Sequence, residues 1–183
     1  MPNWCHNKLV ISNHDLAQMQ WLRQGVKDDG FFNHIKPVPE GLEYNAHEMS
    51  EEVRNAFMLE YGVNSGYDWR NMYWGTKWDV EPTIVSEGID DSGGYIDLEF
   101  DTAWGPPDGI YCTLVEMGFI VYAEYFEPGM CFGGWYTTED NVLTNVNTDS
   151  IHDPNNEVRQ VINDTFGIDG FYDQDEDDEG EVE

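Results

Sequence analysis

Basic residues are scarce in this sequence and almost vanish from its second half. The 183 residues include 8 lysines and arginines against 37 aspartates and glutamates, a formal net charge of −29 at neutral pH. Residues 1–77 contain 10 acids and 7 bases, whereas residues 78–183 contain 27 acids and a single base, Arg159. A surface this acidic repels DNA, RNA and anionic membranes. The natural electrostatic complement is a basic partner.

Cysteines and long apolar runs are also few. The sequence has three cysteines, an odd number, and they are far apart: Cys5, Cys112 and Cys131. They are not typical of a secreted disulfide framework, so we expect free thiols. The first residues, MPNWCHNKLVIS, contain no basic segment and no apolar run long enough for a signal peptide or a membrane span. We therefore expect a cytoplasmic protein.

Motifs of the common enzyme classes are missing as well. The sequence has no G-x-S-x-G elbow, no P-loop, no G-x-G-x-x-G after a strand and no H-E-x-x-H. His34, His47 and His152 fall in expected loops or strand ends, and the adjacent Cys5 and His6 suit no common zinc spacing. With 37 acids, carboxylate pairs arise at any spacing by chance. The sequence thus predicts no catalytic residue, no metal site and no cofactor.

An alternating strand pattern marks the middle of the chain. Within residues 95–101 the side chains alternate, which is typical of a strand with one wet face. The apolar face holds Ile96, Leu98 and Phe100, and the acidic face holds Asp97, Glu99 and Asp101. Pro106 and Pro107 suit the first turn of a following helix, and Gly118 suits its end. The next segment, Ile120–Phe126, is apolar on both faces apart from Glu124, which favours a strand inside the sheet, beside the first.

Weaker patterns predict further elements before this centre. Strands are expected at Trp4–Ser12 and at Phe31–Ile35. Between them, Asn13 should cap a helix whose core-facing residues are Leu16, Met19, Leu22 and Val26. Ser50 should start a second helix, with Val53, Ala56, Phe57 and Tyr61 facing inward. Residues 64–79 show no clear period, and we expect an ordered, tryptophan-rich connection there. A strand at Val80–Ser86 should form a hairpin with the central strand, and Pro82 favours an edge or a bulge.

The end of the chain is predicted from its turns and its loss of apolar residues. We expect strands at Met130–Thr137 and Val142–Val146 and a helix that starts near Asp153 and ends at Gly167, with Val158, Val161, Ile162 and Thr165 facing inward. Nine of the residues in 169–183 are acids, which predicts a disordered tail. The expected organisation is one domain over residues 1–150 with a helical insertion near 48–79, a C-terminal helix at 151–168 and the tail at 169–183.

Four segments together suggest a family. MPNWCHNKLVI, FFNHIKPVPE, WGTKWD at Trp74–Asp79 and FDTAWGPP at Phe100–Pro107 resemble the YubB-like ferredoxin-like proteins carried by phages and plasmids. The resemblance implies an α+β fold, with a ferredoxin-like antiparallel sheet and helices on one face, and an origin in a mobile element. It supplies no activity and no catalytic residue. The matching positions are expected to be caps, turns and core anchors: Asn3, Trp4, Asn7, Trp74, Gly75, Lys77, Trp78, Trp104 and Pro106.

The acidic second half suggests a function of its own. Alternate residues of one strand are about 6.8 Å apart, whereas DNA phosphates follow one another about every 3.4 Å along each strand. Several rows of carboxylates are therefore needed to imitate a nucleic acid. The candidates are Asp97, Glu99, Asp101, Glu81, Glu87, Glu124 and Glu127. We hypothesise that they bind and block a basic, nucleic-acid-binding host protein, as a nucleic-acid mimic directed against host defence.

Three alternatives stay open. The Asp97 row could hold a divalent cation such as calcium or magnesium, because its carboxylates share one face of a strand. The chain could be an uncharacterised small enzyme. It could also be a soluble accessory protein whose charge serves no specific contact.

Overall fold

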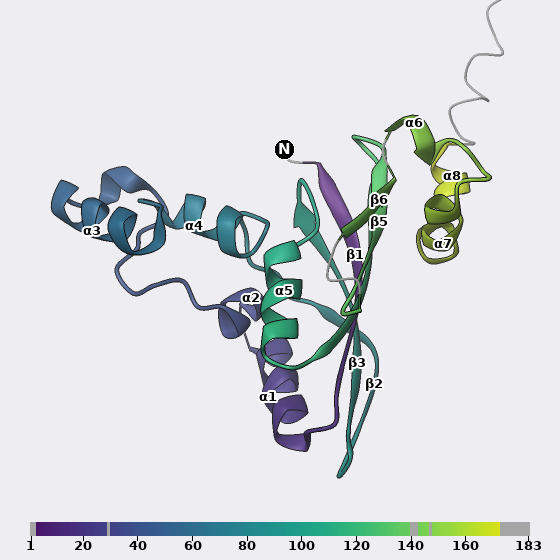
Figure 1. Cartoon of the computed structure of the whole chain (residues 1–183), viewed down its shortest axis with the longest axis horizontal. Helices are drawn as coiled ribbons and strands as arrows, with labels where there is room; N and C mark the ends of the chain where they lie inside the picture. The colour runs from purple at the N-terminus through teal and green to yellow at the C-terminus, as the bar shows by residue number, and fades with distance from the viewer. Residues whose placement is uncertain (1–2, 29, 140–142, 147, 173–183) are drawn as a thin grey trace, which may run out of the picture.

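The computed structural model describes residues 3–28, 30–139, 143–146 and 148–172, and its backbone is organised around one open sheet (Figure 1). The strands are β1 (Trp4–Asn13), β2 (Thr83–Asp90), β3 (Gly93–Ala103), β4 (Ile120–Glu127), β5 (Phe132–Thr137) and β6 (Leu143–Val146). Their order is β2-β3-β1-β4-β5-β6, and each neighbouring pair is antiparallel. The predicted α+β class with an antiparallel sheet is confirmed.

Helices cover the two faces of the sheet unequally. They are α1 (Leu16–Lys27), α2 (Phe31–Ile35), α3 (Glu51–Tyr61), α4 (Gly66–Tyr73), α5 (Asp108–Glu116), α6 (Thr148–Ile151), α7 (Glu157–Phe166) and α8 (Ile168–Tyr172), with a 3-10 turn at Ala46–Glu48. Figure 1 shows α1, α2 and α5 on one face, called the inner face here, and α7 and α8 on the opposite, outer face. Helices α3 and α4 extend away from the sheet. Within the described residues, no helix has the length and apolar content needed to span a bilayer.

The central strand follows the predicted alternation. Ile96, Leu98 and Phe100 are buried against the inner-face helices, whereas Glu99 and Asp101 are exposed on the outer face. Pro107 precedes α5, and Gly118 beyond its end has a left-handed φ of 90° that glycine adopts without strain. Strand β4 lies inside the sheet as expected, but β1 separates it from β3.

The first helix is buried along the predicted stripe but capped by a different residue. Met19, Leu22 and Val26 are buried. The carboxylate of Asp15 accepts hydrogen bonds from the first backbone N–H groups of α1. The predicted cap, Asn13, instead accepts a hydrogen bond from the backbone N–H of Asp15. The N-cap of the helix thus lies two residues later than expected.

The structure differs from the prediction at three places in residues 31–79. Residues 31–35 form α2 rather than a strand, because both Phe31 and its neighbour Phe32 are buried, whereas a strand would place them on opposite faces. Helix α3 begins after Ser50 and ends at Gly62 as predicted. Its predicted inward face forms only in part, because Phe57 and Tyr61 pack against the core while Val53 and Ala56 are exposed. The connection at 64–79, which showed no helical period, contains a helix, α4, and this helix lies within the helical insertion expected near 48–79.

The remaining boundaries shift by a few residues. Strand β2 begins at Thr83, so Pro82 precedes it and removes no ladder hydrogen bond. Helix α7 starts after Asn156 rather than near Asp153 and ends at Gly167 as predicted. The predicted tail begins within α8, and residues 173–183 lie outside the described residues. All three cysteines are free thiols: Cys5 is buried, Cys112 exposed and Cys131 intermediate.

Candidate binding site at the open edge of the sheet

The structure separates the predicted carboxylates. Asp97, Glu99 and Asp101 share the outer face of β3, but Glu87 of β2 faces the other way. Its neighbour across the ladder is the buried Ile96, and its carboxylate accepts hydrogen bonds from the Arg23 guanidinium of α1 at the inner face. These bonds hold the pKa of the Glu87 carboxyl below its ordinary value. Glu87 therefore stabilises the contact between α1 and β2 and does not extend the Asp97 row.

Two further predicted carboxylates are buried. Glu124 is only 6% exposed and accepts hydrogen bonds from the hydroxyls of Tyr122 and Thr165, the latter on α7. Glu127 is 1% exposed and accepts the backbone N–H groups of Gly129, at 2.8 Å, and Met130, at 2.6 Å. Both carboxylates therefore accept hydrogen bonds from donors within the fold and do not face solvent. The expected continuous surface of seven carboxylates does not form.

Two side chains of β1, those of His6 and Lys8, lie beside the acidic row of β3. The Nδ1 atom of His6 is 2.7 Å from a carboxylate oxygen of Asp101, and the Nζ atom of Lys8 is 3.9 Å from one of Asp97. Among the described residues, no three acids, histidines or cysteines gather closely enough to hold a metal ion. Glu99 and Asp101 remain exposed, so the acidic outer face is narrower than predicted.

Some positions that match the family pattern serve the core, as expected. Trp74 is fully buried, and its indole N–H donates to the backbone oxygen of Lys36 at 2.8 Å. The side-chain amide of Asn7, also buried, donates to the Cys5 backbone oxygen at 2.7 Å and to the Thr102 hydroxyl at 2.8 Å. Asn7 thus joins β1 to β3, and Trp74 joins the end of α4 to the chain after α2.

Three other tryptophans of the pattern are exposed, which the sequence did not predict. Trp4 is 44%, Trp78 39% and Trp104 54% exposed. The ring centroids of Trp4 and Trp78 are 5.9 Å apart, and the Nζ atom of Lys77 lies 4.2 Å from the centre of the Trp78 ring and 5.8 Å from that of Trp104. Large exposed aromatic side chains that cluster are typical of contact surfaces.

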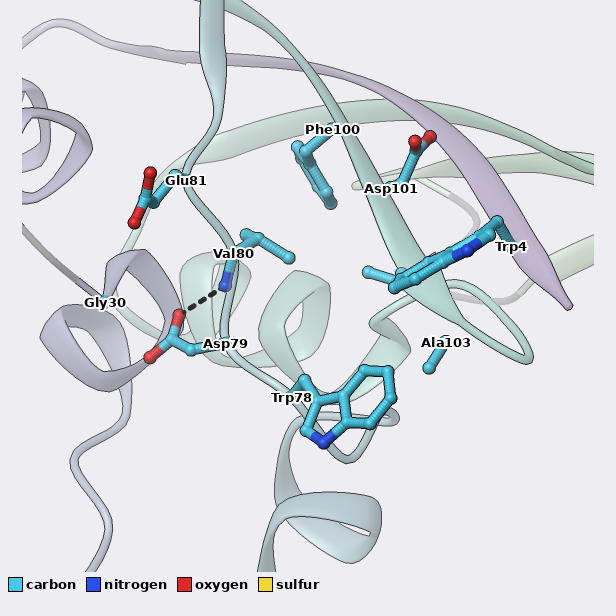
Figure 2. Close-up of a pocket in the computed structure, with 10 residues that line it drawn as sticks. Trp4, Gly30, Trp78, Asp79, Val80, Glu81, Phe100, Asp101 and Ala103 are labelled. Atoms are coloured by element: carbon cyan, nitrogen blue, oxygen red, sulfur yellow. Dashed lines mark hydrogen bonds between the residues drawn. The ribbon is translucent and has the colours of Figure 1, made fainter. Parts of the chain in front are cut away.

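A pocket opens between Trp4, Trp78 and the edge of the sheet (Figure 2). It has a volume of about 410 Å³ and is lined by Trp4, Gly30, residues 78–81 and residues 100–103. We call it the tryptophan notch. Three lining residues are acids, Asp79, Glu81 and Asp101, and no lysine, arginine or histidine is among the described residues that line it.

The notch exists because β2 stops short of the end of β3. Strand β1 pairs with β3 as far as Ala103, whereas the pairing with β2 ends where Thr83 faces Glu99. The segment before β2 is held on α2 instead: the backbone oxygen of Val80 accepts the Phe31 N–H at 3.3 Å. Residues 100–103 therefore border an open edge rather than another strand.

Asp79 explains both the position of this segment and the formation of α2. Its carboxylate accepts the backbone N–H groups of Phe32, at 2.7 Å, and Asn33, at 2.9 Å, in the first turn of α2. It also accepts the N–H of Val80 at 2.9 Å, the bond drawn in Figure 2. Asp79 is thus occupied by the fold. The carboxylate of Glu81 and the Asp101 oxygen that does not contact His6 are left to contact an occupant of the notch.

The notch combines aromatic walls with carboxylates at its rim. Indole faces attract cations, most strongly when these are partly desolvated, and a guanidinium stacks on them well. Lys77 above Trp78 shows that such a contact already forms in this region. A second hollow of about 300 Å³ shares Phe100 and Asp101 with the notch and is also lined by His6, Glu99 and Phe171. The site thus suits a cationic side chain and continues along the outer face.

Comparisons with known proteins assign no family. No family model matches the chain, and no curated protein matches it. Among solved structures, the chain is similar to the crystal structure of protein api92 from Yersinia pseudotuberculosis, described with the family model DUF1281. The sequence identity is 10%, the match covers 80% of this chain and 98% of that one, and the TM-score is 0.35. At these values the likeness is distant, and no conclusion about the site depends on it.

Proposed function

We propose that the chain is a non-enzymatic binding protein for a basic protein partner and that the tryptophan notch is its main contact site. The observation that carries the proposal is the clustering of exposed Trp4 and Trp78 beside the carboxylates of Glu81 and Asp101. Aromatic side chains supply most of the energy in many interfaces, and carboxylates select cationic groups.

The charge of the whole chain supports the same partner class. A net charge of −29 attracts basic surfaces over distances longer than one contact and speeds their association. It repels nucleic acids and acidic proteins. Specific binding then needs a local site, because general attraction does not select among basic proteins. The notch supplies such a site.

We keep the partner class predicted from the sequence, a basic nucleic-acid-binding protein, and propose a different binding mode for it. Nucleic-acid-binding proteins present arginines and lysines for phosphate contacts, and these are the side chains that the notch suits. Because two of the seven carboxylates are buried and Glu87 faces α1, we do not attribute binding to an array that imitates phosphate spacing. We place the contact at the notch and the adjoining Glu99 and Asp101.

We also infer that β1 to β4 form the ferredoxin-like unit implied by the family resemblance. The order β2-β3-β1-β4 supports this inference, as do α1 after β1 and α5 after β3 on one face. On this view β5, β6 and the last helices are additions beyond the common unit.

A direct test measures the affinity of a fluorescently labelled arginine-rich peptide by anisotropy. The double variant Trp4→Ala/Trp78→Ala should bind roughly tenfold or more weakly than the wild type, since a good cation–aromatic contact and its packing are lost. Tyr95→Ala is the matched control, because it removes an exposed aromatic of β3 at the other end of the strand. Equal weakening in both variants, or none in either, would refute the notch as the contact site.

A further inference from the structure

The backbone at the notch carries hydrogen-bonding groups that the sheet does not use. In an antiparallel ladder, successive residues direct their N–H and C=O groups to alternate sides of the strand. The Trp104 N–H donates to the Asn3 oxygen beside β1 at 3.0 Å, so Asp101 and Ala103 direct theirs to the opposite side. That side is the open edge.

One contact confirms this direction. The backbone oxygen of Ala103 accepts the Thr76 hydroxyl at 3.2 Å, and Thr76 belongs to the connection that runs past the notch and not to β1. The Asp101 N–H, the Asp101 C=O and the Ala103 N–H have no hydrogen-bond partner among the described residues. Such an edge is a template for another strand.

From this edge we propose that the partner binds through an extended basic segment that adds to β3 as a strand at residues 100–103. This inference rests on the proposed function and specifies its binding mode. The open stretch is four residues, or about 13 Å, long enough for three or four residues of an added strand. Figure 2 shows residues 78–81 on the other side of the pocket from Phe100, Asp101 and Ala103. An added strand would lie between these two stretches.

The geometry also specifies the side-chain pattern of that segment. Side chains of a strand alternate between the two faces. On the outer face they meet Asp101 and Trp4, which suits arginine or lysine. On the inner face they meet Phe100 and Val80, which suits a smaller apolar residue. The recognised segment is therefore an alternation of basic and apolar residues.

Charge argues against two other occupants of the open edge, a second copy of this chain and the chain's own residues 173–183. A second copy of this chain carries the same net charge of −29. The chain's own residues 173–183 contain no base. Either would place further carboxylates beside Glu81 and Asp101, where like charges repel. A basic segment from another protein is the occupant that the site favours.

The test is a scan of backbone N-methylation along one peptide of alternating arginine and valine. Strand addition predicts that N-methylation weakens binding about tenfold at every second residue, where the N–H faces β3, and little at the residues between them. In a complex with the unmodified peptide, the amide hydrogens of Asp101 and Ala103 should exchange more slowly.

The outcomes separate this inference from the function on which it rests. If the unmodified peptide does not bind, or binds the Trp4→Ala/Trp78→Ala variant equally well, the proposed function fails and strand addition fails with it. If binding depends on the tryptophans but the scan shows no alternation, the proposed function stands and strand addition is overturned.

Discussion

The indole rings of Trp4 and Trp78 lie 5.9 Å apart at an interplanar angle of 41°, although one begins β1 and the other precedes β2. Both remain substantially exposed at the open edge of β3. Their proximity creates an aromatic wall beside the carboxylates of Glu81 and Asp101, with Lys77 over the Trp78 ring.

Neutralising the rim of the notch should reduce the salt dependence of peptide binding. In Glu81→Gln/Asp101→Asn, the affinity for the arginine-rich peptide should fall at low salt, and its decrease with rising salt should be shallower than in the wild type. Asp91→Asn/Glu116→Gln removes two exposed charges outside the notch and serves as the control for net charge. Measuring the affinity of each protein for the peptide from about 20 to about 300 mM salt distinguishes the rim variant from the control and the wild type. An equal dependence of affinity on salt in the rim variant and the wild type would contradict a role for Glu81 and Asp101 in binding.

Trp104 adopts a backbone conformation that favours glycine. Its φ is 76°, and a left-handed conformation costs a residue with a Cβ about 1–2 kcal/mol. Trp104→Gly should therefore be more stable than Trp104→Ala by about 1 kcal/mol, although glycine usually destabilises a folded chain. Urea unfolding of the two variants measures the difference, and an alanine variant of equal or greater stability would show that the position is unstrained.

Glu127 should act in folding and not in binding. Its removal in Glu127→Ala leaves the backbone N–H groups of Gly129 and Met130 without their acceptor, and the free energy of unfolding should decrease by about 1–3 kcal/mol. Glu99→Ala, on the exposed outer face, should change it by less than about 0.5 kcal/mol. Chemical unfolding of both variants tests this contrast, which would disappear if Glu127 were a surface residue.

The contact between Arg23 and Glu87 predicts a pH dependence of stability. The guanidinium lowers the folded-state pKa of the Glu87 carboxyl, so the contribution is present above the ordinary carboxyl pKa of about 4.3 and is lost as the pH falls through the lower folded-state value. The difference in Tm between the wild type and Glu87→Gln should thus be largest near neutral pH and vanish in acid. In an Arg23→Gln background the difference should be small at every pH. A Tm difference between the wild type and Glu87→Gln that increases as the pH falls would contradict a lowered pKa of Glu87 in the folded state.

The fold could be predicted where local pattern determines structure. Strand β3 alternates strictly, and α5 lies between Pro107 and Gly118, so both were found from sequence alone. Helix α2 could not be found in this way. Its five residues read as a short apolar strand, and the carboxylate that caps it belongs to Asp79, 47 residues from Phe32.

The site could not be predicted for a similar reason. Tryptophans in an aromatic-rich connection are usually core residues, and Trp74 is one. Whether Trp4 and Trp78 are buried depends on where β2 begins, which is a property of tertiary structure. Carboxylates in strands were expected on the surface, but α7 covers Glu124, a contact between elements far apart in the sequence.

The most direct test of the binding site is hydrogen exchange of the whole chain with and without the arginine–valine peptide. The account predicts slower exchange in residues 78–81 and 100–104, and no such change in Trp4→Ala/Trp78→Ala. Protection spread over the acidic residues of the chain with none at the notch, or unchanged exchange at Asp101 and Ala103 under saturating peptide, would contradict it.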